Sequence, residues 1–217
     1  MNPYETRRYL AEYLQFHFGN RRDFFPYPFP PRGALDFHRR IIRDCLLPIR
    51  FPHPTRGLDL GCAVGRLTQE LARVVDEATG VDNSRPFIRA ARRIVRAKNV
   101  RFLVADAHCV TGQYHVVLAV NLICRLRQPR QFLARLPDLV VPGGQLVLAT
   151  PYSWLEQFTP RRQWIRPADL PGLLSPQFTL KRRRDLPFLI REHERKYQLV
   201  ISDVLTFRRL PDPAGSR

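Results

Sequence analysis

A short apolar strand followed by a turn of small residues constrains this chain most. The segment Arg56–Arg66 has the sequence RGLDLGCAVGR. Gly61, Ala63 and Gly65 allow a sharp turn whose backbone comes close to a ligand, an approach that a side chain with a branched Cβ would obstruct. A helix is expected next, over Leu67–Val75. The segment therefore predicts a ligand-binding loop at the carboxyl end of a strand.

The spacing of the small residues indicates the kind of ligand. A dinucleotide-binding fingerprint requires a third glycine at position 66, where this chain has Arg66. The order Asp59-x-Gly61-x-Ala63-x-Gly65 instead resembles the first motif of class I S-adenosylmethionine-dependent methyltransferases. This resemblance implies S-adenosylmethionine as the cofactor and S-adenosylhomocysteine as its product. Glycine-rich turns of this kind also occur as plain tight connections between a strand and a helix.

Strands and helices alternate along the middle of the chain. Strands are expected at Arg56–Leu60, Glu77–Val81, Val100–Val104, His115–Ala119 and Gln145–Ala149, with helices at Pro86–Arg96 and Pro129–Leu139. This alternation predicts a parallel sheet with right-handed crossovers. Two further strands, Phe178–Arg183 and Val200–Arg208, are separated by Pro187–Tyr197 and should form an antiparallel edge. The expected fold is α/β and Rossmann-like, of the class I methyltransferase type, with a mostly parallel seven-stranded sheet.

The N-terminal part lies outside this alternating pattern. Helices are expected at Pro3–Phe18 and Ala34–Leu47, and Phe24–Pro31 is expected to be a rigid linker because its prolines cannot continue a helix. We expect residues 1–50 to form a helical cap over the active site. Residues 51–210 should form the methyltransferase domain, and residues 211–217 a flexible tail.

Charge and cysteines exclude several classes of protein. The formal charge of +17 comes almost entirely from arginines that are dispersed along the chain, which favours a solvated basic surface over a nucleic-acid partner. No run approaches the roughly 20 apolar residues of a membrane span, and the N-terminus lacks the apolar core of a signal peptide, so a cytoplasmic location is expected. Cys45, Cys62, Cys109 and Cys124 have no metal-ligand spacing, so they are expected to be free thiols without a metal site.

Polar residues follow successive expected strands. Asp82 is placed to accept hydrogen bonds from ribose hydroxyls, and Asp106 suits an adenine amino group. Asn121 should lie near the point where the methyl donor meets its acceptor. Alternatively, the two acids could cap helices and Asn121 could close a turn, although caps need not fall at successive strand ends. The expected cofactor-binding residues are Asp59, Gly61, Cys62, Ala63, Gly65, Asp82, Asn83, Asp106, Ala107, Asn121 and Leu122.

Five blocks of the sequence resemble one family of methyltransferases. They are Tyr4-Glu5-Thr6, EYLQFHFG (residues 12–19), DLGCAVGR (59–66), GGQLVLATPYSWLEQFTP (143–160) and LPFLIREHERKYQ (186–198). These blocks are similar to those of the methyltransferase of ovothiol biosynthesis. That family methylates an imidazole nitrogen of 5-thiohistidine (4-mercaptohistidine), the last step of ovothiol A biosynthesis. The resemblance implies an N-methyltransferase with this small-molecule substrate.

The chain departs from the family at three places. His115 and Cys124 replace acids that the family usually has, and the connection from Arg96 to Val100 lacks an insertion. In bifunctional relatives an iron-dependent sulfoxide synthase domain precedes this one, and it is not present here. We therefore expect the thiohistidine to be supplied by a separate sulfoxide synthase and lyase pathway.

The resemblance also suggests an acceptor site. Tyr13, Phe18, Tyr152 and Trp154 are expected to sandwich a flat ring, although ordinary packing explains each of them equally well. Arg191 offers a forked donor for the carboxylate of an amino acid.

Glu5 is expected to pair with the α-ammonium group of the amino acid. His17, Tyr13 and Asn121 are the expected catalytic residues. Among the groups able to accept a proton from the acceptor ring, His17 is preferred over Tyr13 and Glu5.

Three alternative functions remain open. The basic charge would also suit a methyltransferase acting on RNA or on a protein, whose binding would weaken steeply with salt. The selenium analogue, selenohistidine, could replace thiohistidine as the acceptor. The replacements at His115 and Cys124 are also compatible with a catalytically silent protein that keeps the fold.

Overall fold

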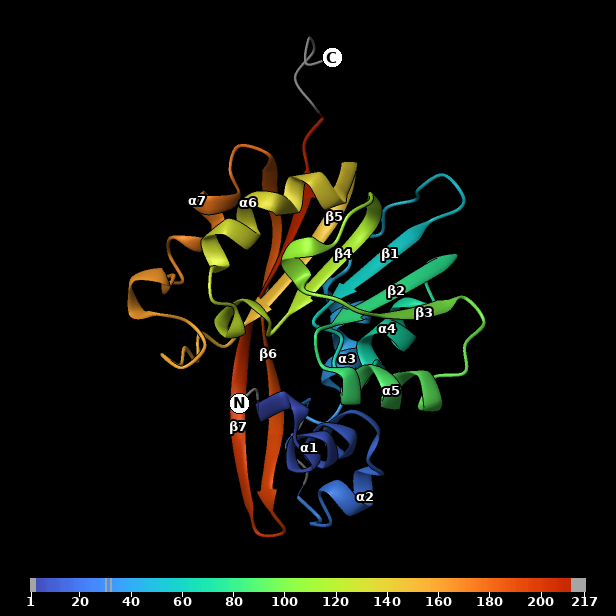
Figure 1. Ribbon diagram of the computed structural model, residues 1–217, viewed down its shortest axis with the longest axis vertical. Coiled ribbons are helices and arrows are strands. Elements are labelled where there is room, and N and C mark those ends of the chain that lie inside the picture. Colours follow the sequence, from blue (N-terminus) through green and yellow to red (C-terminus); the bar gives the residue numbers. More distant parts are fainter. Residues whose placement is uncertain (1–2, 30, 32, 212–217) are drawn as a thin grey trace.

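One seven-stranded sheet forms the centre of the molecule (Figure 1). The computed structural model describes residues 3–29, 31 and 33–211. The strands are β1 (Arg56–Leu60), β2 (Glu77–Asp82), β3 (Val100–Val104), β4 (Tyr114–Val120), β5 (Val140–Thr150), β6 (Phe178–His193) and β7 (Lys196–Arg209). Their order is β3-β2-β1-β4-β5-β7-β6. The first five are parallel and β7 is antiparallel to both of its neighbours, so the predicted sheet is confirmed.

Helices cover both faces of this sheet. They are α1 (Arg7–Phe18), α2 (Arg21–Phe24), α3 (Phe37–Arg40), α4 (Arg66–Leu71), α5 (Arg85–Ile94), α6 (Pro129–Leu139) and α7 (Leu170–Leu174). Short turns of helix add η1 (Pro3–Glu5), the π-helical η2 (Ile41–Cys45), η3 (Ala107–Cys109), η4 (Ile123–Arg125) and η5 (Arg161–Gln163). One core cluster joins α3, η2 and α4 to one face, and another joins α6 and α7 to the opposite face. The alternation of buried residues along β4 separates these two clusters.

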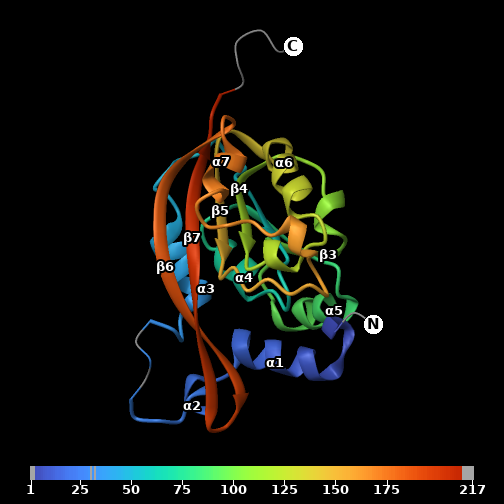
Figure 2. The same cartoon turned by 90° about the vertical axis from the view of Figure 1, so that its left-hand side faces the viewer.

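The final hairpin is longer than the sequence predicted. The strands were expected to be separated by Pro187–Tyr197, but β6 and β7 pair through most of this segment. Pro187 is tolerated because β6 is the edge strand, where a missing N–H group breaks no ladder on the outer side. The hairpin therefore extends beyond the sheet and reaches α1 and α2 (Figures 1 and 2).

The N-terminal helices are shorter than predicted. The expected helix over Pro3–Phe18 divides at Thr6, whose hydroxyl caps α1 by accepting from the backbone N–H of Tyr9 (3.4 Å). The expected helix over Ala34–Leu47 is reduced to α3 and η2. The predicted linker Phe24–Pro31 begins inside α2 and includes position 30, which lies outside the described residues. Of the predicted tail, residues 212–217 also lie outside them.

Other boundaries differ as well. The helix expected over Leu67–Val75 ends at Leu71. Strand β5 begins at Val140 and not at the expected Gln145, so it includes the turn Pro142-Gly143-Gly144. The turn is accommodated inside the strand because the pairing with β4 shifts register there.

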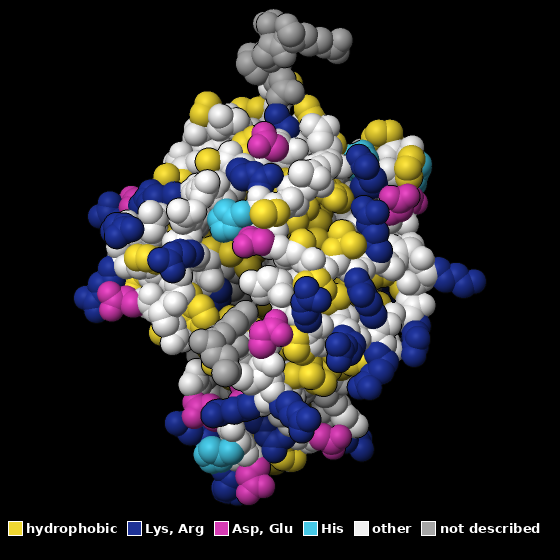
Figure 3. Space-filling view, viewed as in Figure 1, with side chains coloured by type: hydrophobic (Ala, Val, Ile, Leu, Met, Phe, Trp, Pro, Cys, Tyr) yellow, Lys and Arg dark blue, Asp and Glu magenta, His cyan; other side chains and the backbone are white. Residues whose placement is uncertain are grey.

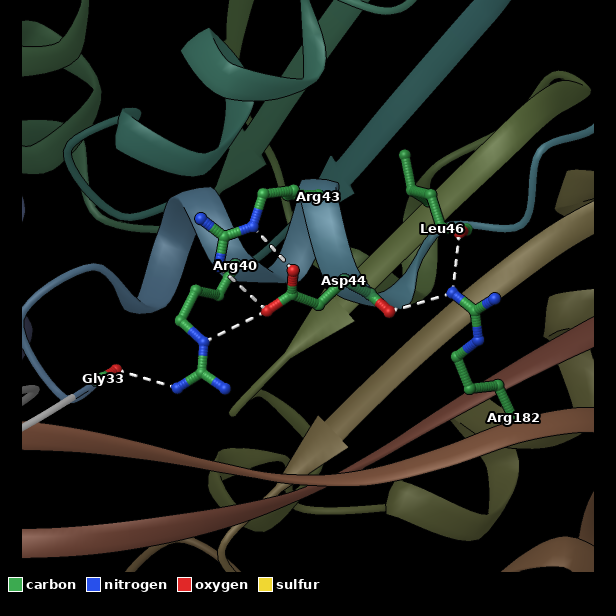
Figure 4. A network of polar contacts seen from close by, with 6 residues as sticks. All are labelled: Gly33, Arg40, Arg43, Asp44, Leu46 and Arg182. Atoms are coloured by element: carbon green, nitrogen blue, oxygen red, sulfur yellow. Dashed lines mark hydrogen bonds and ion pairs between the residues drawn. The ribbon is translucent and has the colours of Figure 1, made fainter.

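A polar network fastens the π-helical turn to the hairpin (Figure 4). The carboxylate of Asp44 accepts hydrogen bonds from Arg40 (3.1 Å) and Arg43 (2.6 Å). From β6, a guanidinium nitrogen of Arg182 donates to the backbone carbonyl of Asp44 (2.9 Å). These contacts hold α3, which carries His38, close to the hairpin.

Basic side chains are spread over the surface. Figure 3 shows Lys and Arg side chains over α5, over the hairpin and over the loops on the left-hand side, with acidic and apolar groups between them. This arrangement agrees with the dispersion of arginines in the sequence and forms no single basic stripe on that face. Among the described helices, none combines the length and apolarity that crossing a membrane requires.

Substitution at Gly65 tests the packing of the glycine turn. Gly65 has φ +89°, and an added Cβ would lie 2.6 Å from the Phe102 ring. We expect Gly65→Ala to lower the free energy of unfolding by about 2–4 kcal/mol, because backbone strain and overpacking add. Gly172→Ala in α7 is the control, since its Cβ meets no atom within 4 Å, and it should change stability by less than about 1 kcal/mol. Urea unfolding of both variants measures the difference, and equal effects would contradict the packing argument.

Candidate functional site

The glycine turn is held against the end of β2. The backbone N–H groups of Gly61 and Cys62 both donate to the carbonyl of Val81 (2.8 and 3.0 Å), and that of Ala63 donates to the carboxylate of Asp82 (3.0 Å). Gly61 and Ala63 have left-handed φ values of +72° and +47°. The end of β2 therefore fixes the glycine turn through the backbone of Val81 and the side chain of Asp82.

Asp82 keeps acceptor capacity for a ligand. Its second carboxylate oxygen accepts from the backbone N–H of Ser84 (2.8 Å). A carboxylate has about four lone-pair directions, so two backbone bonds leave acceptors free for hydroxyl donors. Burial raises the pKa of Asp82, and the N–H groups of Ser84 and Ala63 oppose that rise. The structure thus places an acid with open acceptor positions where ribose hydroxyls were expected.

Asp59 has a structural partner. Its side chain is buried and accepts a hydrogen bond from the Thr68 hydroxyl (2.7 Å), which ties β1 to α4. Burial raises the pKa of Asp59 to about 7, and the bond from Thr68 lowers it. Burial therefore favours the protonated carboxyl group, whereas the bond from Thr68 favours the ionised one.

Asp106 makes the helix cap that the alternative interpretation predicted, whereas the side chain of Asn121 contacts a distant residue on β7. Asp106 caps η3 by accepting from the backbone N–H of His108 (2.8 Å). Asn121 has a left-handed φ of +54°, and its side-chain oxygen accepts from the Ser202 hydroxyl (2.7 Å). Both residues also line the cavity described next, so these contacts are compatible with a ligand contact.

A cavity of about 870 Å³ opens at the carboxyl ends of the parallel strands. This volume lies within the usual range for small-molecule sites. Thirteen predicted site residues line it: Tyr13, His17, Asp59, Gly61, Cys62, Ala63, Asp82, Asn83, Asp106, Ala107, Asn121, Leu122 and Arg191. Leu122 lies over the glycine turn, because a Cβ on Gly61 would meet its Cδ1 at 2.9 Å.

Other predicted residues have different partners and lie outside the lining. Glu5 accepts from the backbone N–H of Arg85, and Phe18 packs under the guanidinium of Arg66. Gly65 packs against Phe102. The phenol of Tyr152 donates to Asp203 (2.7 Å), and Trp154 stacks on Trp164. The expected aromatic sandwich is therefore not assembled from Phe18, Tyr152 and Trp154, because tertiary packing directs each ring to another neighbour.

Residues 4–18 cover the glycine turn, and we call them the N-terminal roof. Tyr4, Tyr13 and Phe18 pack against a cluster that includes Ala63 and Phe87. The Ser84 hydroxyl donates to the Tyr4 carbonyl (2.9 Å).

The side chain of Tyr4 connects this roof to two loops. Arg125 donates to the Tyr4 phenol (3.1 Å), and the Tyr4 ring stacks on Phe158 with a centroid distance of 5.7 Å. Sequence reasoning missed Arg125 and Phe158. The position of Arg125, shortly after the end of β4, was the only local signal for it.

Burial shifts the pKa values of two side chains on α1, His17 and Tyr13, in opposite directions. Burial, His38 and Arg66 lower the pKa of His17 well below its usual value, so its imidazole is neutral at pH 7. Within the described part of the chain, Nδ1 of His17 is buried and has no hydrogen-bond partner. Burial raises the pKa of Tyr13, so its phenol remains protonated at pH 7. It can donate a hydrogen bond but cannot act as a base.

The two replaced acids lie in different surroundings. His115 is the second residue of β4, and its ring nitrogen accepts from the backbone N–H of Arg56 (3.0 Å), away from the cavity lining. Cys124 is buried, lines the cavity and lies beside Arg125, whose Nη1 is 3.4 Å from its sulfur. Of these two residues, only Cys124 belongs to the lining of the cavity.

The topology and the cavity together define a class of protein. A glycine turn after β1, an acid after β2 and a polar cavity at the strand ends are the features of an α/β domain that binds a nucleoside-containing cofactor. A family model described as "Methyltransferase domain" matches residues 20–186. The chain belongs to this family and contains a methyltransferase domain of the S-adenosylmethionine-dependent class.

Relatives and solved structures agree with this assignment. An uncharacterized methyltransferase of Mycobacterium tuberculosis is 33% identical over 118 residues, 52% of this chain and 60% of the relative. A carboxy-S-adenosyl-L-methionine synthase of Stutzerimonas stutzeri is 31% identical over 48% of this chain and 49% of that protein. The matched part thus spans about half of the length of these curated relatives. The fold resembles magnesium protoporphyrin IX methyltransferase of Synechocystis PCC 6803 with bound S-adenosylhomocysteine (TM-score 0.65, 17% identity, 95% and 96% of the two chains).

Replacement of Asp82 tests its predicted contact with the cofactor. Asp82→Asn offers one acceptor oxygen in place of two, so the glycine turn and the ribose hydroxyls compete for it. We expect the dissociation constant of S-adenosylhomocysteine to rise at least tenfold, which corresponds to about 1.4 kcal/mol. Asp138→Asn, on the exposed surface of α6, is the control and should bind like the wild type. Calorimetric titration distinguishes them, and unchanged affinity in Asp82→Asn would contradict the assignment.

Removal of the Thr68 hydroxyl tests the buried acid. Because the folded-state pKa of Asp59 is raised, the native state binds the proton more tightly and stability falls as pH rises from about 4 to 7. Thr68→Val removes the bond to the ionised form, so we expect a loss of about 1–3 kcal/mol at pH 8 and a smaller loss at pH 5. Thr68→Ser keeps the hydroxyl and should show little of this pH dependence. Urea unfolding at both pH values measures it, and equal losses would argue against the role of the bond.

Proposed function

We propose that this methyltransferase transfers a methyl group from S-adenosylmethionine to an imidazole nitrogen of 5-thiohistidine, the last step of ovothiol A biosynthesis. The main support is that two blocks carrying the family resemblance, residues 12–19 and 186–198, meet at the same cavity. Phe16 and Phe188 pack with a centroid distance of 5.7 Å. Residues of both blocks line the cavity, although about 170 positions separate them in the sequence.

The cofactor suits one half of the cavity. We infer that Asp82 accepts hydrogen bonds from the ribose hydroxyls, and that Asp106 and Ala107 contact the adenine. The glycine turn and Asn121 would then border the sulfonium end. The left-handed turn at Gly61, which leaves no room for a side chain beneath Leu122, supports this close approach.

The acceptor suits the other half, where charged groups lie at the hairpin. Arg191 donates through Nη1 to the carbonyl of Asp23, and its remaining donors are available to a carboxylate. Glu12 lines the cavity as well, which makes it a better partner for the α-ammonium group than the predicted Glu5. This proposal therefore revises one predicted contact of the acceptor.

The protein supplies alignment, exclusion of water and acceptance of a proton. The sulfonium of the cofactor provides an activated methyl group, and holding the two reactants in line is worth roughly 7–11 kcal/mol. His17 is the proposed proton acceptor because its neutral imidazole has an unpartnered nitrogen, whereas Tyr13 keeps its proton and Glu5 lies outside the lining. Asn121 is proposed to border the reacting groups.

A methyl-transfer assay tests the function. Purified protein with S-adenosylmethionine and 5-thiohistidine should release S-adenosylhomocysteine and an N-methylated product, identified by mass spectrometry. Histidine without the sulfur is the negative control, and selenohistidine tests the choice of chalcogen. Binding of S-adenosylhomocysteine without any transfer to thiohistidine would refute the proposed acceptor.

Replacement of His17 tests the proposed proton acceptor. His17→Gln should lower kcat by about 10²–10⁴-fold, because a positioned base is removed, while the affinity for S-adenosylhomocysteine stays within about threefold. His53→Gln is the matched control, since His53 is 81% exposed and pairs with Asp76 outside the cavity. Equal activity of the two variants would contradict the role of His17.

A further inference from the structure

Five aromatic and imidazole rings form a continuous wall of the cavity. His17 lies 4.2 Å from His38 between ring centroids, and Phe16 lies 5.2 and 4.9 Å from the same two rings. Phe188 packs on Phe16 at 5.7 Å and on Phe37 at 4.9 Å. All five line the cavity, and they come from α1, α3 and the hairpin. We call these residues the ring wall.

The ring wall combines apolar faces with a nitrogen atom that has no hydrogen-bond partner. Among the described residues, Nδ1 of His17 is buried without a partner, and the half-buried ring of His38 lies against the His17 ring. A buried nitrogen left without a partner costs free energy, so it is a position where a ligand that donates a hydrogen bond gains affinity. Phe16, Phe37 and Phe188 provide no competing polar group.

The surroundings keep both imidazoles uncharged. Burial and the positive charge of Arg66 lower the pKa of His38 to about 3, and the same factors act on His17. Arg66 itself is directed to Glu70, at 2.9 Å. Glu12 and Tyr13 on α1 and Arg191 on β6 are the other titratable groups that line this side of the cavity.

We propose that the ring wall is the subsite for the acceptor's ring and that His38 determines specificity there, together with His17. The ligand class is a flat five-membered heteroaromatic that carries a ring N–H, such as an imidazole. The inference deepens the proposed function and rests on it. The rings of the wall contact the face of the acceptor, and the neutral imidazole nitrogens accept from its N–H.

This arrangement also explains how the product leaves. The ring nitrogen with the free lone pair attacks the methyl carbon, the carbon–sulfur bond breaks, and sulfur keeps the electron pair. The proton on the other ring nitrogen passes to His17, whose lowered pKa favours immediate release of this proton to water. The methylated ring then carries no N–H. Its free ring nitrogen and the imidazole nitrogens of the ring wall are all hydrogen-bond acceptors, so the product binds less tightly than the substrate.

His38→Phe tests the subsite, because it keeps a flat ring but removes both nitrogens. We expect kcat/KM for 5-thiohistidine to fall at least tenfold, mainly through KM, with the dissociation constant of S-adenosylhomocysteine within about threefold of wild type. His53→Phe is the matched control outside the cavity. Unchanged kcat/KM, or an equal loss of cofactor affinity, would overturn the proposal.

A second measurement uses the wild-type protein and separates this inference from the proposed function. In the complex with S-adenosylhomocysteine, nitrogen NMR signals of His17 and His38 should shift on addition of imidazole and not on addition of thiazole, which lacks the N–H. Such shifts without methyl transfer to thiohistidine would refute the proposed function and support the subsite. Signals unaffected by imidazole, or shifted equally by thiazole, would overturn the subsite.

Discussion

The carboxylate of Asp82 is the point on which the site depends. It accepts from the backbone of Ala63 in the glycine turn and of Ser84 at the start of α5. The Ser84 hydroxyl then holds the carbonyl of Tyr4, and the Tyr4 phenol accepts from Arg125. One chain of hydrogen bonds thus links the proposed ribose acceptor to the N-terminal roof and to the loop after β4. Hydrogen bonds linked in this way position their members jointly.

The glycine turn and the alternating strands and helices could be predicted because their sequence signals are local. The glycine turn, the alternation of strands and helices, and the acids after successive strands each follow from neighbouring residues. The same is true of α6, whose predicted bounds Pro129–Leu139 coincide with those observed. All of the residues predicted to bind the cofactor except Gly65 therefore line the cavity.

The acceptor half could not be predicted in this way. Phe37 and His38 lie in no motif, and the block that contains Phe188 does not indicate its neighbours. These rings meet α1 because the hairpin continues past Pro187 and because Arg182 fastens η2 to β6. Trp154 was predicted to contact the acceptor, but it stacks on Trp164. Trp164 lies in a loop whose path no sequence pattern indicated. Aromatic residues in a family block can serve packing as well as binding, and only tertiary contacts separate the two.

The length of the hairpin couples the two ends of the chain. Only the segment from Asp203 to Arg208 of β7 pairs with β5, and the residues nearer the turn pair with β6 alone. A two-stranded ribbon is marginally stable in water, so its outer half depends on the helices that pack against it. Opening of α1 would therefore expose the amides of residues 186–198 to hydrogen exchange. Order in the proposed acceptor site is then a cooperative property of the first and last quarters of the sequence, whereas the sheet can persist without it.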